Sequence, residues 1–442
     1  MDEWRAQSAA ELGRGIAAGR IDPVELAAAF LDAAEAHPEG GRIYARLTRE
    51  RALAEAEAAR GRAKTGLRRG ALDGVPISWK DLFDTAGVAT EAGSRLLEGR
   101  VPARDAEVLE TATLGGSVCL GKTHMTELAF SGLGLNPMTA TPPNATDPAL
   151  APGGSSSGAA VSVALGLAAA GIGSDTGGSV RTPSAWNNLV GLKTTAGRLP
   201  LTGVVPLAAR FDTVGPLCRS VEDAAELLAL LEGGKAADLR GASLSGLRLA
   251  VLETIALDDV RDAPGSAFEQ ALARLSAAGA KVSRVQVPAV AEAFASAAML
   301  FPGEAYGTWG KLIEAAPGKM HPPIRDRFRQ GAGISAEDFV AGWQALDRLR
   351  GVYGEETAGY DAVLLPTTPI LPPDAARLES DPEYFRTENL LALRNTRIGN
   401  LMGLCALTLP TGTDCCGLMV MAAPGQEERL LRIGQAAETA IG

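Results

Sequence analysis

The chain has 442 residues, with 52 acidic against 42 basic side chains, a net charge of −10, and 46% hydrophobic residues. This is a globular composition, and the acidic excess argues against nucleic acid as a direct ligand, because such binding relies on Lys and Arg neutralising phosphates. Five scattered cysteines and three distant histidines favour neither a disulfide framework nor a zinc site, so we expect no metal and no cofactor.

The first 65 residues carry signals of helix starts. Ser8 and Glu11 have capping-box spacing, and Asp22 followed by Pro23 marks a second helix start. Residues 1–65 are therefore predicted to be a helical lead-in packed on a core formed by residues 66–442. The N-terminus has no apolar stretch of the signal-peptide kind, and the longest apolar run, 159–173, is too short to span a bilayer and predicts a buried helix. We expect a cytoplasmic protein without membrane contact.

Strand-like runs alternate with helical segments in the rest of the chain. Short apolar strands are predicted at 75–79 and 117–120, among clusters of Gly, Ser and Pro. Further strands are predicted at 247–252, 281–287, 361–365, 406–409 and 418–421, with helices at 221–231, 265–278, within 290–358 and at 426–440. This alternation favours an α/β fold with a mixed or parallel sheet.

Residues 116–123 match the P-loop pattern G-x-x-x-x-G-K-T, in which Lys122 and Thr123 would serve phosphates and magnesium. A P-loop requires the strand to precede its first glycine, whereas here the four positions between the glycines are themselves the best strand candidate. We expect a strand leading into a surface turn, and a nucleotide-binding protein is kept as a distant alternative.

Residues 154–158 match the G-x-S-x-G nucleophile elbow, which would make Ser156 the nucleophile of an α/β-hydrolase. That elbow follows a central strand, but the preceding stretch, 141–152, contains four prolines, and proline removes ladder donors. His321, within a helical region, is the only histidine downstream. Both observations disfavour this hypothesis.

A longer set of motifs resembles the amidase signature family. Gly153-Gly-Ser-Ser-Ser-Gly158, residues 173–183 and residues 191–198 together resemble the family's signature, and residues 74–87 resemble its upstream lysine motif. Residues 121–132 and 212–223 also resemble the family, so the likeness is dense over 74–223. It implies one large catalytic α/β domain, residues 66–442, with a central twisted mixed sheet covered by helices on both faces. Residues of about 240–400 are expected to vary and to shape the substrate pocket.

The same resemblance selects a serine site that needs no histidine. A lysine that is neutral in a desolvated pocket can act as the base for a serine. By resemblance, Lys80 is that base, Ser155 is a bridging serine that follows a cis peptide from Gly154, and Ser179 is the nucleophile. The expected oxyanion-hole donors are the backbone N–H groups of Thr176, Gly177 and Gly178.

Residues around the two serines are expected to bind substrate or to support the site. Asp175 and Arg181 flank the nucleophile, either as an ion pair that braces the loop or with Arg181 binding a substrate carboxylate. Gly154 and Ser156 are expected to support the bridging serine. The resemblance places the border of the acyl pocket at Leu128, Ala129, Phe130 and Ser131.

The resemblance implies an amidohydrolase that acts on linear C–N bonds other than peptide bonds. It would convert a small or medium carboxylic amide, or a urea-type amide, into an acid plus ammonia or an amine through an acyl-enzyme. The alternative is the glutamine-hydrolysing component of a tRNA-dependent amidotransferase, which has the same catalytic residues but needs partner subunits. As a stand-alone enzyme the chain would need only its small-molecule amide, and a homodimer is left open.

Overall fold

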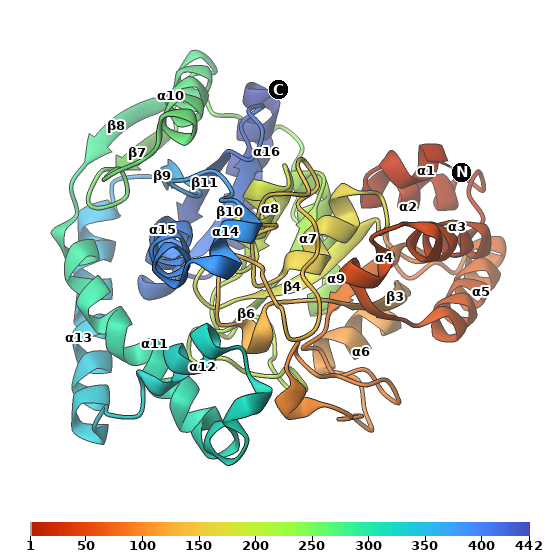
Figure 1. The fold of residues 1–442 in the computed structure, drawn as a ribbon. Coiled ribbons are helices and arrows are strands. Elements are labelled where there is room, and N and C mark those ends of the chain that lie inside the picture. The colour runs from red at the N-terminus through yellow and green to blue at the C-terminus, as the bar shows by residue number, and fades with distance from the viewer. Residues whose placement is uncertain (1) are drawn as a thin grey trace.

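A mixed eleven-stranded sheet forms the centre of the computed structural model, which describes residues 2–442 (Figure 1). The strand order is β1-β3-β2-β4-β6-β5-β10-β11-β9-β7-β8. Pairs β3/β2, β2/β4, β9/β7 and β7/β8 are parallel, and the remaining neighbours are antiparallel. The strands are β1 (Tyr44–Leu47), β2 (Pro76–Lys80), β3 (Val118–Thr123), β4 (Ala170–Asp175), β5 (Val190–Lys193), β6 (Thr213–Cys218), β7 (Arg248–Leu252), β8 (Lys281–Val285), β9 (Ala362–Pro366), β10 (Cys405–Pro410) and β11 (Gly417–Ala422).

Helices flank this sheet, with the N-terminal helices gathered at one end and α10, α11 and α13 toward the other (Figure 1). Within residues 2–442, no helix is both long enough and apolar enough to cross a membrane. The helices are α1 (Asp2–Ala6), α2 (Ala9–Ala17), α3 (Pro23–Ala36), α4 (Gly40–Ile43), α5 (Arg49–Thr65), α6 (Glu107–Leu114), α7 (Ser157–Ala164), α8 (Arg181–Trp186), α9 (Val221–Glu232), α10 (Asp262–Ala277), α11 (Pro288–Ala315), α12 (Pro322–Arg329), α13 (Ala336–Thr357), α14 (Ala375–Ser380), α15 (Pro382–Leu401) and α16 (Glu427–Ile441).

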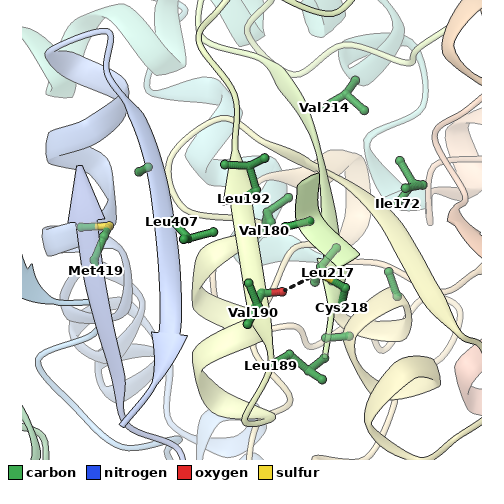
Figure 2. Packing of buried hydrophobic residues seen from close by; sticks show 14 of the residues in the cluster. Ile172, Val180, Leu189, Val190, Leu192, Val214, Leu217, Cys218, Leu407 and Met419 are labelled. Carbon is green, nitrogen blue, oxygen red and sulfur yellow. Dashed lines mark hydrogen bonds between the residues drawn. The ribbon is translucent and has the colours of Figure 1, made fainter. Parts of the chain in front are cut away.

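The central strands are buried on both faces. Every residue of β2 to β6 is buried, and the apolar side chains of β4, β5 and β6 pack with those of β10 and β11 (Figure 2). Leu192, Leu217 and Leu407 have no exposed surface and stand in this core. A strand buried on both faces reads as a continuous apolar run rather than an alternating one, because helices cover both sides of the sheet.

The predicted helix starts at Ser8 and Asp22 are confirmed. Ser8 Oγ accepts the N–H of Glu11 while the Glu11 carboxylate accepts that of Ser8, and Asp22 caps α3. The lead-in also contains a strand that was not predicted, β1, which pairs antiparallel with β3. The first 65 residues therefore contribute one edge of the sheet.

The prediction of one buried helix over 159–173 is wrong. Helix α7 ends at Ala164, and the run continues through a turn into strand β4. Gly166 adopts a φ of +68° just after the helix, a left-handed conformation that commonly terminates helices. The second half of the run is thus a buried strand, which periodicity alone does not distinguish from a helix.

The P-loop lookalike is a strand. The predicted strand is confirmed, but the predicted surface turn is wrong, since β3 continues to Thr123 and is buried throughout. Lys122 lies 3.1 Å from Asp81 Oδ1 and donates to Thr90 Oγ1 at 2.8 Å. A lysine committed to these partners is not available to bind phosphates.

Candidate active site

Lys80 is the last residue of β2 and has no exposed surface. Its Nζ donates hydrogen bonds to Ser155 Oγ at 2.7 Å and to Ser174 Oγ at 2.8 Å. Burial lowers the pKa of Lys80 to about 7, although the negative charges of Asp212 and Asp175 act in the opposite direction. A large fraction of this amine is therefore neutral at neutral pH.

Ser155 lies in the loop that leads into α7, directly after a cis peptide bond from Gly154, as the resemblance implied. Gly154 donates its N–H to Gly132 O at 2.8 Å. A Cβ at position 154 would lie only 2.7 Å from Gly134 N, so this close approach of two backbone segments requires glycine. The loop is thus fixed from both sides.

Ser179 lies on the loop between β4 and α8, is 4% exposed, and lines a narrow cavity. Its carbonyl accepts the N–H of Ser156 at 3.2 Å, which joins the two serine loops. Ser156 also donates its hydroxyl to Ser174 O at 3.2 Å. No hydrogen bond within residues 2–442 joins the hydroxyls of Ser155 and Ser179, so the fold brings Lys80, Ser155 and the Ser179 loop together with one contact still open.

The structure corrects the predicted set of oxyanion donors. The N–H of Gly178 donates to Asp175 Oδ1 at 2.9 Å and is therefore engaged. Within the described chain, the N–H groups of Thr176, Gly177 and Ser179 have no protein acceptor. Ser179 N–H thus takes the place of Gly178 N–H among the free donors beside the nucleophile candidate.

Asp175 and Arg181 form a buried ion pair that braces the Ser179 loop. Arg181 Nη2 lies 2.8 Å from Asp175 Oδ1, and its Nη1 donates to Thr396 O at 2.6 Å. Burial alone would raise the pKa of Asp175, but the Arg181 guanidinium and its hydrogen bonds, with help from Asn400, hold it well below the ordinary value. All three guanidinium nitrogens of Arg181 have protein acceptors and the side chain has no exposed surface, so the geometry favours bracing over substrate binding.

This buried pair yields a stability prediction. Arg181→Met leaves the Asp175 carboxylate buried without its counter-charge and should lower the free energy of unfolding by about 3–5 kcal/mol, measured by urea denaturation. Arg240→Met is the matched control, because the Arg240–Asp238 pair lies on the surface and its loss should change stability little. Equal effects of the two substitutions would contradict the bracing role.

Three of the four predicted pocket residues line the cavity beside Ser179. Ala129, Phe130 and Ser131 do so, whereas Leu128 is buried outside the lining, which corrects that prediction. The lining also includes residues that the sequence did not single out: Leu207, Phe301, Arg327, Leu393 and Arg397. Two larger cavities, of about 570 and 710 Å³, lie away from Ser179.

Two polar residues near Lys80 were also missed. Ser174 is the second acceptor of the Lys80 amine, and Asp212 accepts a hydrogen bond from Thr176 Oγ1 at 2.5 Å. Burial raises the pKa of Asp212, against its hydrogen bonds from Thr176 and two backbone N–H groups. Both stand inside segments that resemble the amidase signature family, and that position was the available signal.

Comparison with known proteins agrees with this arrangement. The model of the family described as Amidase matches residues 25–431. The chain is 37% identical to 2-amino-5-chloromuconic acid deaminase of Comamonas testosteroni, over 84% of this chain and 83% of that protein. It is 31% identical to the glutamyl-tRNA(Gln) amidotransferase component GatA-type protein of Anaeromyxobacter dehalogenans, over 98% and 96%. A crystal structure of an amidase, 30% identical, superposes with a TM-score of 0.87 over 99% of this chain and all of the other. The chain belongs to the amidase signature family.

Proposed function

We propose that the chain hydrolyses a small or medium carboxylic amide, with Ser179 as nucleophile, Ser155 as bridging serine and Lys80 as base. Membership of the family makes it an amidohydrolase that acts on C–N bonds. The observation that carries the residue assignment is the buried Lys80 amine, 2.7 Å from Ser155 Oγ on the loop joined to Ser179. A base of lowered pKa in contact with a hydroxyl is the arrangement that activates a serine.

The reaction begins when Ser179 Oγ attacks the amide carbonyl carbon. Ser179 turns toward Ser155 as substrate binds, gives its proton to Ser155, and the Ser155 proton passes to neutral Lys80. The oxyanion accepts hydrogen bonds from the N–H groups of Thr176, Gly177 and Ser179. The proton then returns through Ser155 to the nitrogen, the C–N bond breaks, and ammonia or an amine leaves. Water attacks the acyl-enzyme by the same relay and releases the acid.

The pH profile tests the protonation state of Lys80. Because the neutral amine is the base and the pKa is about 7, kcat/KM should rise as the pH increases through about 7 and then level off. Burial lowers the pKa of His321, and a His321→Asn variant should keep the same limb. A profile that is flat through this range, or that falls with rising pH, would contradict a neutral lysine base.

A substrate screen with the purified chain tests the overall proposal. Primary amides and urea derivatives are supplied singly, and released ammonia is measured with a coupled assay. The name of the 37% identical relative assigns it the deamination of an amino-substituted acid, which supports ammonia release from a small molecule. Turnover by the chain alone is the expected result, and light scattering in the same buffer distinguishes a monomer from the homodimer left open above.

The second candidate is the glutamine-hydrolysing component of an amidotransferase. It is favoured by the similarity to the Anaeromyxobacter dehalogenans protein along nearly the whole of both chains. Under this alternative, ammonia release from glutamine would depend strictly on partner subunits. Hydrolysis of simple amides without any partner would exclude it.

A further inference from the structure

The cavity beside Ser179 holds two charged residues, and both are arginines. Arg327 comes from α12 and Arg397 from α15, two separate helices (Figure 1). The rest of the lining is uncharged, with apolar walls from Phe130, Leu207 and other residues. The hollow in front of the proposed nucleophile is therefore positively charged although the chain as a whole is acidic.

Neither guanidinium has an anionic partner in the described chain. Within residues 2–442, Arg327 and Arg397 form no ion pair and no side-chain hydrogen bond, in contrast to the fully paired Arg181. Their side-chain neighbours are aromatic: Arg327 stands 4.5 Å over the Phe130 ring, and Arg397 is 6.0 Å from that of Phe301. Half-buried cations without counter-charges are costly, so the protein retains two positive charges here at the expense of stability.

The two charges act on each other and on the site. Burial lowers the pKa of Arg327 to about 9, and the charge of Arg397 lowers it further. Arg397 also stands against the Ser179 loop, since a Cβ placed on Gly177 would lie 4.0 Å from its Nε. The preceding residue, Thr396, donates its hydroxyl to Gly177 O at 2.8 Å. An anion between the guanidiniums would relieve their repulsion within reach of the reacting carbonyl.

We propose that the substrate carries a carboxylate that binds Arg327 and Arg397, and that the preferred substrates are monoamides of short dicarboxylic acids. Guanidinium and carboxylate match in geometry and charge, and the apolar walls suit a short methylene chain between the two ends. A primary amide loses only ammonia, so the carboxylate belongs to the acyl part, which stays on Ser179 in the acyl-enzyme. This inference rests on the proposed function and adds its substrate class.

The test compares succinamic and glutaramic acids with butyramide, an uncharged amide of similar length. Wild type should show a kcat/KM at least about 10-fold higher for the acids, because charged hydrogen bonds are lost with the neutral amide. Arg327→Gln and Arg397→Gln should each raise KM for the acids by about 10- to 100-fold with a much smaller change in kcat, and should lower the preference for acid over neutral amide. Arg327→Lys should keep part of the preference.

The control is Arg329→Gln, on the same helix but paired with Glu314 at the surface, which should keep the wild-type preference. Equal losses for acids and butyramide in the glutamine variants would overturn the proposal, as would a wild type that prefers butyramide. Labelling of Ser179 by a fluorophosphonate, measured by mass spectrometry in each variant, separates the two hypotheses. Without a Ser179 adduct in wild type the proposed function fails, whereas an adduct without acid preference refutes only the carboxylate site.

Discussion

Ser179→Ala should lower kcat for a primary amide by about 10⁴- to 10⁶-fold, the range found when one member of a serine site that acts as a unit is removed. The substitution deletes the oxygen that attacks the carbonyl, but it leaves the loop intact, because Ser179 contributes its carbonyl, and not its hydroxyl, to the hydrogen bond with Ser156. KM should change far less than kcat. Stopped assays of released ammonia measure the effect, and wild type treated with a fluorophosphonate should carry its adduct on Ser179.

Ser157→Ala is the matched control for this loss. Ser157 is a buried serine at the start of α7, and its Oγ has no hydrogen-bond partner within the described chain. Its removal should leave kcat within about threefold of wild type, since it deletes an unpartnered hydroxyl. A Ser179→Ala enzyme with normal turnover, or an adduct on Ser155 or Ser156, would show that the nucleophile is misassigned.

Local signals predicted much of the fold. The capping residues Ser8 and Asp22 act within one helical turn, so their effect could be inferred without tertiary structure. The run 159–173 could not be resolved, because a buried helix and a buried strand are both continuously apolar and only the φ of Gly166 separates them. Strand β1 was missed for a related reason, since its four residues gain their structure from pairing with β3.

The candidate site divides in the same way. Lys80, Ser155 and Ser179 were selected by motifs that resemble the family, and the fold brings them together. Which N–H groups remain free could not be foreseen, because the Asp175 carboxylate accepts from Gly178 only after the loop closes on itself. Arg327 and Arg397 lie outside every motif, and only packing of α12 and α15 brings them to the cavity.

Lys80→Met should lower kcat for a primary amide by about 10²- to 10⁴-fold, the usual contribution of general acid–base catalysis, while lowering ester turnover much less. Methionine keeps the length of the side chain but removes the nitrogen that Ser155 contacts. An amide nitrogen leaves only when protonated, whereas an alkoxide or phenolate leaves without that proton. Loss of Lys80 should therefore reduce the ratio of amide to ester turnover, measured with an amide and an ester of the same acid.

Lys193→Met tests whether that change is specific to the base. Lys193 is also fully buried, and burial lowers its pKa to about 8, but its Nζ donates to the carbonyls of Thr194 and Leu404 and contacts no serine hydroxyl. Its substitution should reduce stability and leave the amide-to-ester ratio unchanged. If both lysine variants shift that ratio equally, the effect belongs to packing of the sheet. If only Lys80→Met shifts it, the proton that reaches the leaving nitrogen passes through Lys80, because no other difference between the two substitutions acts on the leaving group.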